Sequence, residues 1–337
     1  MLIKKINSMK YLFFLFFVFF LIKVCNAQEK QFNSIAGIRI INETDVAIIK
    51  KQNELHERLK DYIFLYANKN NDSTIIATTF CIENNIKKAD AYFWRARSYE
   101  NTTKYQLAVE DYNKAIEFKS ISLTSIYSSK GECLEKLGKI NEAITAYNMS
   151  IDYANNNIKN KSVGFEYSYN TIVYSTLYIA RAKAKTGSST EALKILDEIN
   201  TSKLNSKNIF YNQVKPSYYA AYAYCYANNN DFKNAKNSLN NSLTTNDSTN
   251  FEAFYIKGLI SFLEGQYIQS IKEFDFAINI GNKKVYKIYY GINGECYFQK
   301  GLAFLKLNKK EEACTSFKEA SKMNVFNVGN LILENCK

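Results

Sequence analysis

The feature that most constrains the fold is a spacing of twelve residues between two small side chains, which recurs along the chain. In "ARSYENTTKYQLAVEDY", Ala96 precedes Ala108 by this spacing, and Tyr112 follows four residues later. The same spacing separates Gly131 from Ala143, Ala180 from Ala192, Ala223 from Ala235, Gly258 from Ser270, and Gly301 from Ala313. Six copies of one spacing indicate a structural unit that repeats along the chain.

Each copy has the sequence pattern of two helices joined by a turn. Large apolar residues lie three or four positions from the small ones, as they do on one face of a helix. Short polar segments such as "ENTTK", "KTGSS" and "NNNDF" separate the two halves. A single Pro and 12 Gly among 337 residues favour helices over many tight turns. We therefore expect helix pairs that approach closely at the small residues. Large side chains should fill the space beside each contact, namely Tyr112, Tyr147, Phe274 and Phe317.

This pattern resembles the tetratricopeptide repeat family, whose unit is a helix–turn–helix of about 34 residues. The resemblance is clearest at Tyr92, Ala96, Tyr99, Ala108, Tyr112 and Ala115, at Tyr127, Gly131, Leu134, Gly138, Ala143 and Tyr147, and at Tyr297, Gly301, Phe304, Ala313, Phe317 and Ala320. Lys183 and Ser261 depart from the large apolar residue of the pattern, and the family's terminal proline is absent throughout. The resemblance implies an all-α, right-handed superhelical solenoid of antiparallel helix pairs.

The spacing of the repeats predicts how the chain is divided. The expected segments are a loose leader at 28–43, a degenerate N-terminal helical or capping repeat at 44–88, six helix pairs over 89–322 with longer insertions near 151–172, 200–215 and 279–293, and a C-terminal capping helix at 323–337. Leu331, Ile332 and Leu333 are expected to be the apolar positions of that last helix. Pro216 is expected to open a helix, because its fixed φ suits a first turn.

Residues 1–27 have the composition of a secretory signal peptide. A basic start precedes an apolar run at 11–22, which is too short to span a bilayer as a straight helix. Small residues then precede an expected cleavage between Ala27 and Gln28. We expect an exported protein, periplasmic or secreted, that meets the membrane only through the cleaved signal. An uncleaved signal anchor and a lipid on Cys25 are the alternatives.

The six cysteines beyond the signal match no metal-binding spacing. Cys314 and Cys336 fall on adjacent predicted helices and form the one candidate disulfide, because an exported protein can keep such a bond. The others are expected to be small apolar core residues.

The sequence contains no recognisable catalytic constellation. His56 is the single histidine, so neither a Ser-His-Asp nor a Cys-His arrangement is supported. Paired carboxylates, such as Glu132 with Glu135 or Glu311 with Glu312, are expected to be solvated charges. We expect no enzymatic activity, no cofactor and no metal site. The chain has a net charge of +12, but its Lys and Arg residues form no contiguous block. This argues against a nucleic-acid partner.

The resemblance implies that the first helix of each pair lines a concave surface that binds a partner. The candidate groove residues are Phe93, Arg97, Arg181, Lys185, Tyr224, Asn228, Tyr255, Phe262 and Phe298. Aromatic anchors and basic groups suit a protein or peptide ligand, although several of these residues would equally serve as core.

We therefore expect a non-enzymatic scaffold or adaptor of the bacterial envelope, similar to exported repeat proteins of the Bacteroidetes group. The alternative is a glycan-binding or outer-membrane uptake accessory protein, which exposure of Trp94 in a groove would favour. A third possibility is an enzyme whose active site lies on the inserted loops near 151–172 or 200–215. The sequence leaves the partner and the oligomeric state open.

Overall fold

The computed structural model describes residues 70–162, 165–202, 209–243, 251–283 and 290–336, all within one compact unit of the chain. The regular structure of these residues is entirely α-helical. The predicted signal peptide, the leader, most of the degenerate repeat and His56 lie outside them.

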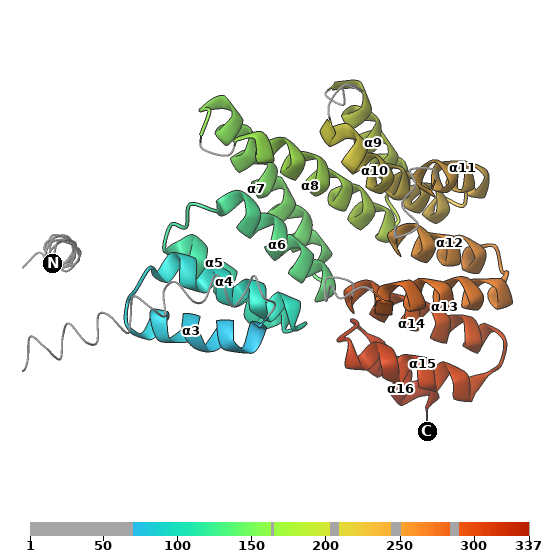
Figure 1. The fold of residues 1–337 in the computed structure, drawn as a ribbon. Helices are drawn as coiled ribbons and strands as arrows, with labels where there is room; N and C mark the ends of the chain where they lie inside the picture. The colour runs from blue at the N-terminus through green and yellow to red at the C-terminus, as the bar shows by residue number, and fades with distance from the viewer. Residues whose placement is uncertain (1–69, 163–164, 203–208, 244–250, 284–289, 337) are drawn as a thin grey trace, which may run out of the picture. The chain divides into compact units, whose positions relative to one another are not determined.

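The helices of the described part follow one another as hairpins (Figure 1). They are α3 (Asn71–Glu83), α4 (Lys88–Asn101), α5 (Tyr105–Glu117), α6 (Leu123–Lys136), α7 (Ile140–Lys159), α8 (Phe165–Lys185), α9 (Ser189–Ser202), α10 (Ile209–Asn228), α11 (Phe232–Leu243), α12 (Phe251–Leu263), α13 (Tyr267–Lys283), α14 (Tyr290–Lys306), α15 (Lys310–Lys322) and α16 (Val328–Asn335). Each helix packs on the one before it. From α4 to α14, the first helix of each pair also contacts the first helix of the next pair. The expected all-α solenoid of helix pairs is confirmed.

Small residues and aromatic rings hold the two helices of a pair together. The closest contacts join Gly131 to Tyr147, Gly258 to Phe274, and Gly301 to Phe317. A Cβ atom added to any of these glycines would lie only 2.4–2.6 Å from a ring carbon, so the ring occupies the place of a side chain. The three rings are fully buried. The twelve-residue spacing therefore encodes a contact that only a very small residue permits.

The turn inside each of the six pairs contains one residue with a left-handed backbone. These residues are Thr103, Gly138, Gly187, Asn230, Gly265 and Asn308. A left-handed residue ends a helix and redirects the chain. These turn residues thus end the first helix of each pair.

Two local expectations are wrong. Pro216 does not open a helix but lies inside α10, which begins at Ile209. The helix therefore extends before the proline, and the Ser242 hydroxyl donates a hydrogen bond of 2.7 Å to the Pro216 carbonyl. Leu333 is 70% exposed, whereas Val328 is buried. Val328, Leu331 and Ile332 share the inner face of α16 at helical spacing, and Leu333 lies on the opposite face.

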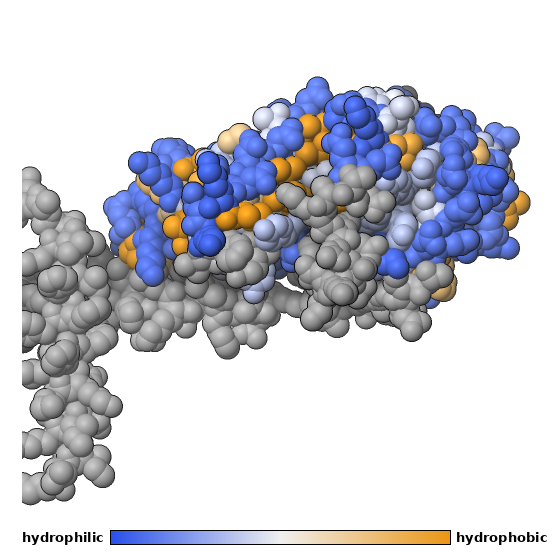
Figure 2. Space-filling view, turned by 90° about the horizontal axis from the view of Figure 1, so that it is seen from above, coloured by the Kyte–Doolittle hydropathy of each residue, from blue (hydrophilic) through white to orange (hydrophobic). Residues whose placement is uncertain are grey.

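Part of the extra length near residues 151–172 and 279–293 is helical, because α7 continues to Lys159, α8 begins at Phe165, and α13 continues to Lys283. None of the described helices combines the length and the apolar character needed to cross a bilayer. Hydrophilic residues cover much of the face in Figure 2, with a broken apolar band between them.

A substitution at Gly301 tests the close contact between helices. Gly301→Val should lower the free energy of unfolding by about 1–3 kcal/mol, because the new side chain meets the Phe317 ring. Gly329→Val is the matched control: no atom lies within 4 Å of the Cβ position there, so its stability should stay close to that of the wild type. Urea unfolding followed by circular dichroism measures both. Equal effects of the two substitutions would contradict the packing account, whereas a smaller effect of Gly301→Val in a Phe317→Leu background would support it.

Candidate functional site

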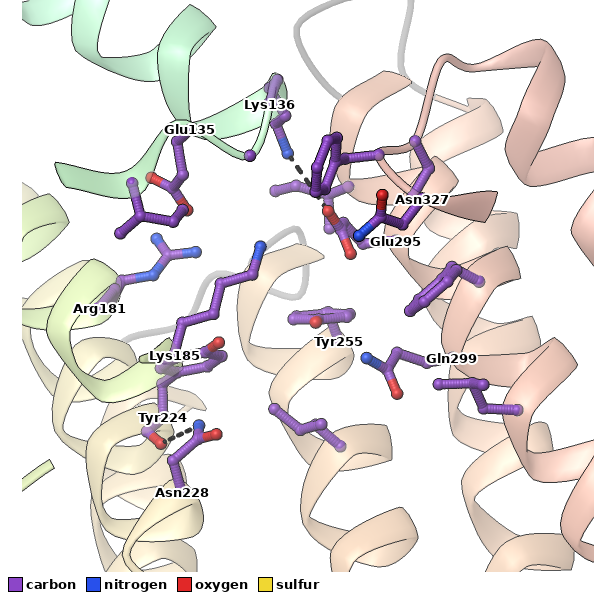
Figure 3. A pocket seen from close by; sticks show the side chains of 18 of the residues that line it. Glu135, Lys136, Arg181, Lys185, Tyr224, Asn228, Tyr255, Glu295, Gln299 and Asn327 are labelled. Carbon is purple, nitrogen blue, oxygen red and sulfur yellow. Dashed lines mark hydrogen bonds and ion pairs between the residues drawn. The ribbon is translucent and has the colours of Figure 1, made fainter. Parts of the chain in front are cut away.

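The first helices of successive pairs line an inner cavity of about 590 Å³ (Figure 3). Its walls come from α6, α8, α10, α12 and α14, together with residues 325–327 between α15 and α16. This volume is typical of cavities that bind small ligands. A smaller cavity of about 400 Å³ lies between α4, α6 and α8.

A simple register rule places the side chains that line the cavities. In each pair, the residue directly after the first small residue lines one of them. These residues are Arg97, Glu132, Arg181, Tyr224, Leu259 and Leu302. The first two line the smaller cavity and the other four line the larger one. The contact that packs each pair therefore also fixes which neighbouring side chain faces inward.

The structure places every sequence-predicted groove residue on one of these two cavity walls. Arg181, Lys185, Tyr224, Asn228, Tyr255, Phe262 and Phe298 line the larger cavity, and Phe93 and Arg97 line the smaller one. Tyr224 and Tyr255 are only 9% and 8% exposed, so they also belong to the hydrophobic core. Contact of these nine residues with a ligand stays a prediction.

The larger cavity has a basic wall on α8. The Arg181 guanidinium forms an ion pair with Glu252 and lies 5.7 Å from the centre of the Tyr224 ring. Burial by itself lowers the pKa of Arg181, but the carboxylates of Glu252 and Glu135 raise it, and the net pKa is above the ordinary value. Arg181 is therefore a fixed positive charge. Lys185 is exposed, extends toward the cavity in Figure 3, and has no ion pair or hydrogen bond within the described residues.

Two carboxylates also line the cavity, and that of Glu135 lies close to Arg181 (Figure 3). Glu135 and Glu295 line the cavity from α6 and α14. The Lys136 ammonium lies 4.0 Å from a Glu295 carboxylate oxygen, and Gln299 adds an uncharged amide on α14. The Tyr255 ring lies between the basic wall on α8 and helix α14 (Figure 3). A chain with a charged end and an apolar side chain finds a complementary group for each in this cavity.

The sequence analysis did not predict that acidic residues line the cavities. It treated Glu132 and Glu135 as solvated charges, but both line cavities. Glu132 directly follows Gly131 just as Arg97 directly follows Ala96, so the register was the signal that could have identified it. Phe326 and Asn327 were also missed, because no repeat pattern extends into the segment after α15.

The smaller cavity has a different chemistry. Phe93 and Trp94 lie at one side, and its polar residues are mostly hydroxyl or amide groups: Ser125, Ser128, Ser129, Asn170 and Thr171. Arg97 Nη1 donates to Ser129 Oγ at 2.8 Å and to Glu100 Oε2 at 3.2 Å. Burial, and secondarily the charge of Glu100, raise the pKa of Glu132 to about 8. At neutral pH, Glu132 is therefore mostly protonated and uncharged.

A sequence model of the tetratricopeptide repeat matches residues 89–121, 124–157, 216–249 and 294–324. The pairs α8/α9 and α12/α13, in which Lys183 and Ser261 depart from the pattern, have no match of their own. A TPR repeat-containing protein of Methanocaldococcus jannaschii is 35% identical over 98 residues. That alignment covers 28% of this chain and 31% of the relative, so the chain spans about a third of the relative's length.

Two solved structures share the fold at low sequence identity. A tetratricopeptide repeat protein from Parabacteroides merdae aligns with a TM-score of 0.55 and 12% identity, over 85% of this chain and all of that one. The Rap conjugation gene regulator of plasmid pLS20, solved with the Phr* peptide, aligns with a TM-score of 0.50 and 14% identity, over 89% and 82% of the two chains. These structures share the fold of the repeated helix pairs, and the four matched segments show that the chain contains repeats of the tetratricopeptide repeat family.

Proposed function

We propose that the chain is a non-enzymatic scaffold that binds a protein or peptide in its larger inner cavity. The observation that carries the proposal is the pairing of a basic wall, Arg181 and Lys185, with buried aromatic rings in a cavity of ligand size. Tetratricopeptide repeats generally serve as scaffolds rather than catalysts, and the structural relative bound to the Phr* peptide supports a peptide as ligand.

The place of action is part of the same proposal. The sequence of residues 1–27 supports export, and the candidate disulfide suits an oxidising compartment. We place the protein in the bacterial envelope, where it would hold one partner in position for another. Lys185 has no partner within the described residues and faces aromatic rings, so it favours a ligand with a free carboxylate.

The smaller cavity favours a second candidate, the binding of a glycan. Trp94 lies on its wall, and hydroxyl and amide groups face it. Aromatic faces combined with such groups suit an uncharged, hydroxyl-rich ligand. Quenching of the single tryptophan by an oligosaccharide would support this candidate, and unchanged fluorescence across a panel of oligosaccharides would remove it.

A charge reversal at Lys185 tests the proposed binding site. Lys185→Glu should abolish the capture of a specific protein from envelope extract by residues 28–337. The new carboxylate would repel the ligand's own carboxylate, while the exposed position leaves the fold intact. Lys194→Glu makes the same charge change at an exposed position on α9 and should bind as the wild type does. Mass spectrometry identifies the captured proteins. Equal loss in both variants, or no loss in either, would contradict a site in the larger cavity.

The protonation of Glu132 gives a pH-dependent prediction. Its pKa is about 8 in the folded chain and about 4.5 in the unfolded chain, so folding takes up a proton between these pH values. The stability that the Glu132 carboxyl contributes is therefore greatest below pH 4.5 and falls as the pH rises toward 8. Glu132→Gln should gain stability over the wild type across this window, by up to about 1.4 kcal/mol per pH unit.

Unfolding by urea at several pH values measures the effect. Glu110→Gln, at an exposed carboxyl of the neighbouring helix α5, is the control and should follow the wild type throughout. If the difference between Glu132→Gln and the wild type stays constant from pH 5 to pH 8, Glu132 is not protonated in the cavity.

A further inference from the structure

The segment between α15 and α16 reaches back to the first two helix pairs. Asn324 Nδ2 donates hydrogen bonds to Thr103, at 2.7 Å to the hydroxyl and 3.4 Å to the carbonyl oxygen. Thr103 lies in the turn of the α4/α5 pair, 221 residues earlier in the sequence. The Phe326 ring covers Gly138 in the turn of the α6/α7 pair, within 2.4 Å of where a Cβ atom would lie. Residues 323–327, which we name the strap, therefore join the two ends of the described solenoid.

The strap also forms part of the wall of the larger cavity. Val325, Phe326 and Asn327 line it, and Val325 packs on Gly294 of α14. The ion pair of Lys136 with Glu295 joins α6 to α14 beside them (Figure 3). The strap thus bounds the cavity where α6 approaches α14. A cavity of about 590 Å³ holds a few residues of a chain.

The contacts of the strap with the two distant turns are few and accessible. Phe326 is 51% exposed although it covers Gly138, and the hydrogen bonds of Asn324 lie at the surface. Contacts of this kind open locally at much lower free energy than a buried core does. The strap is therefore suited to open and close while the repeats on either side stay folded.

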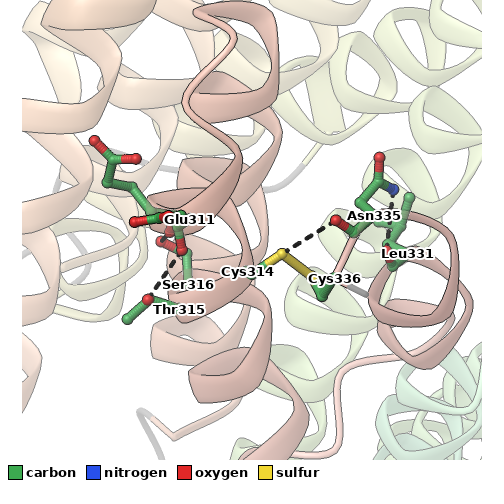
Figure 4. Close-up of a disulfide and its surroundings, with 8 residues drawn as sticks. Glu311, Cys314, Thr315, Ser316, Leu331, Asn335 and Cys336 are labelled. Carbon is green, nitrogen blue, oxygen red and sulfur yellow. Dashed lines mark hydrogen bonds between the residues drawn. A yellow bond between two sulfur atoms is a disulfide. The ribbon is translucent and has the colours of Figure 1, made fainter.

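A covalent bond anchors the far end of the strap. The Cys314–Cys336 disulfide joins α15 to the residue after α16 (Figure 4). Helix α16 has eight residues, and a helix of that length is unstable alone in water. It is held by Val328, buried against Ala313, Phe317 and Ala320, and by the disulfide. With both ends fixed to α15, the strap stays close to the turns that it contacts.

We propose that residues 323–327 form a gate over the larger cavity, that the disulfide keeps the gate in place, and that the closed gate limits the ligand to a short peptide or the carboxyl end of a chain. The limit on the ligand rests on the proposed peptide-binding function, whereas the gate itself does not. Lys185, exposed on the basic wall, would receive the terminal carboxylate, and the strap would exclude chain that continues beyond it.

Hydrogen–deuterium exchange tests the gate without any ligand. The variant Asn324→Ala/Phe326→Ala should speed the exchange of amides in residues 101–104, 136–139 and 323–327 by roughly tenfold, while exchange in the core of α12 stays unchanged. Cys336→Ser should speed exchange in the strap and α16. Leu333→Ala is the control, because it removes an exposed side chain from the outer face of α16 and should leave these segments as in the wild type. Unchanged exchange in the double variant and in Cys336→Ser would overturn the gate.

Binding of random pentapeptides tests the limit on the ligand. The wild type should retain pentapeptides with free carboxyl ends, and should reject the amidated forms and longer peptides that carry the same residues internally. Asn324→Ala/Phe326→Ala should accept the internal sequences. Equal selectivity in the two proteins would overturn the limit even if exchange changes. If neither protein binds any peptide, the proposed peptide-binding function fails, and the exchange result alone decides whether the gate exists.

Discussion

The structure depends on one contact, in which an aromatic ring of the second helix of a pair occupies the place of a missing side chain on the first. Gly131, Gly258 and Gly301 show it most directly, since a Cβ atom at each would overlap a ring. Because the contact repeats, each pair presents its first helix in the same orientation, and these helices contact one another along the array. The inner surface and its cavities follow from that repetition.

The same contact fixes which neighbouring side chains line the cavities. One position after each small residue, the side chain lines one of the two cavities. This position holds Arg97, Glu132, Arg181, Tyr224, Leu259 and Leu302 in the successive pairs. The chain therefore varies charge and size along its inner surface at one register position, where Tyr224 and Leu259 also belong to the hydrophobic core. The larger cavity carries charges of both signs, while the smaller one presents hydroxyls, an amide, the Arg97 guanidinium and the Glu132 carboxyl, whose pKa is raised.

The sequence predicted the features that repeat and failed at those that do not. The pairing of helices and the buried rings of Tyr112, Tyr147, Phe274 and Phe317 follow from periodicity, and the choice of groove residues follows from the resemblance to the repeat family. The raised pKa of Glu132 follows from neither, because it comes from burial in the assembled array and from the charge of Glu100 in the preceding pair. The extension of α10 before Pro216 and the exposure of Leu333 depend on local context that a repeat pattern lacks. The strap meets turns more than 180 residues away, and no local pattern encodes such a contact.

The central claim is that this chain recognises its partner from inside the solenoid. Photo-crosslinking in the native envelope tests it most directly, with p-benzoylphenylalanine in place of Phe298 on the cavity wall or of Tyr167 on α8, which is 75% exposed. The account predicts a discrete crosslinked product from position 298 and none from position 167. A product from position 167 alone would place recognition outside the cavity and contradict the account.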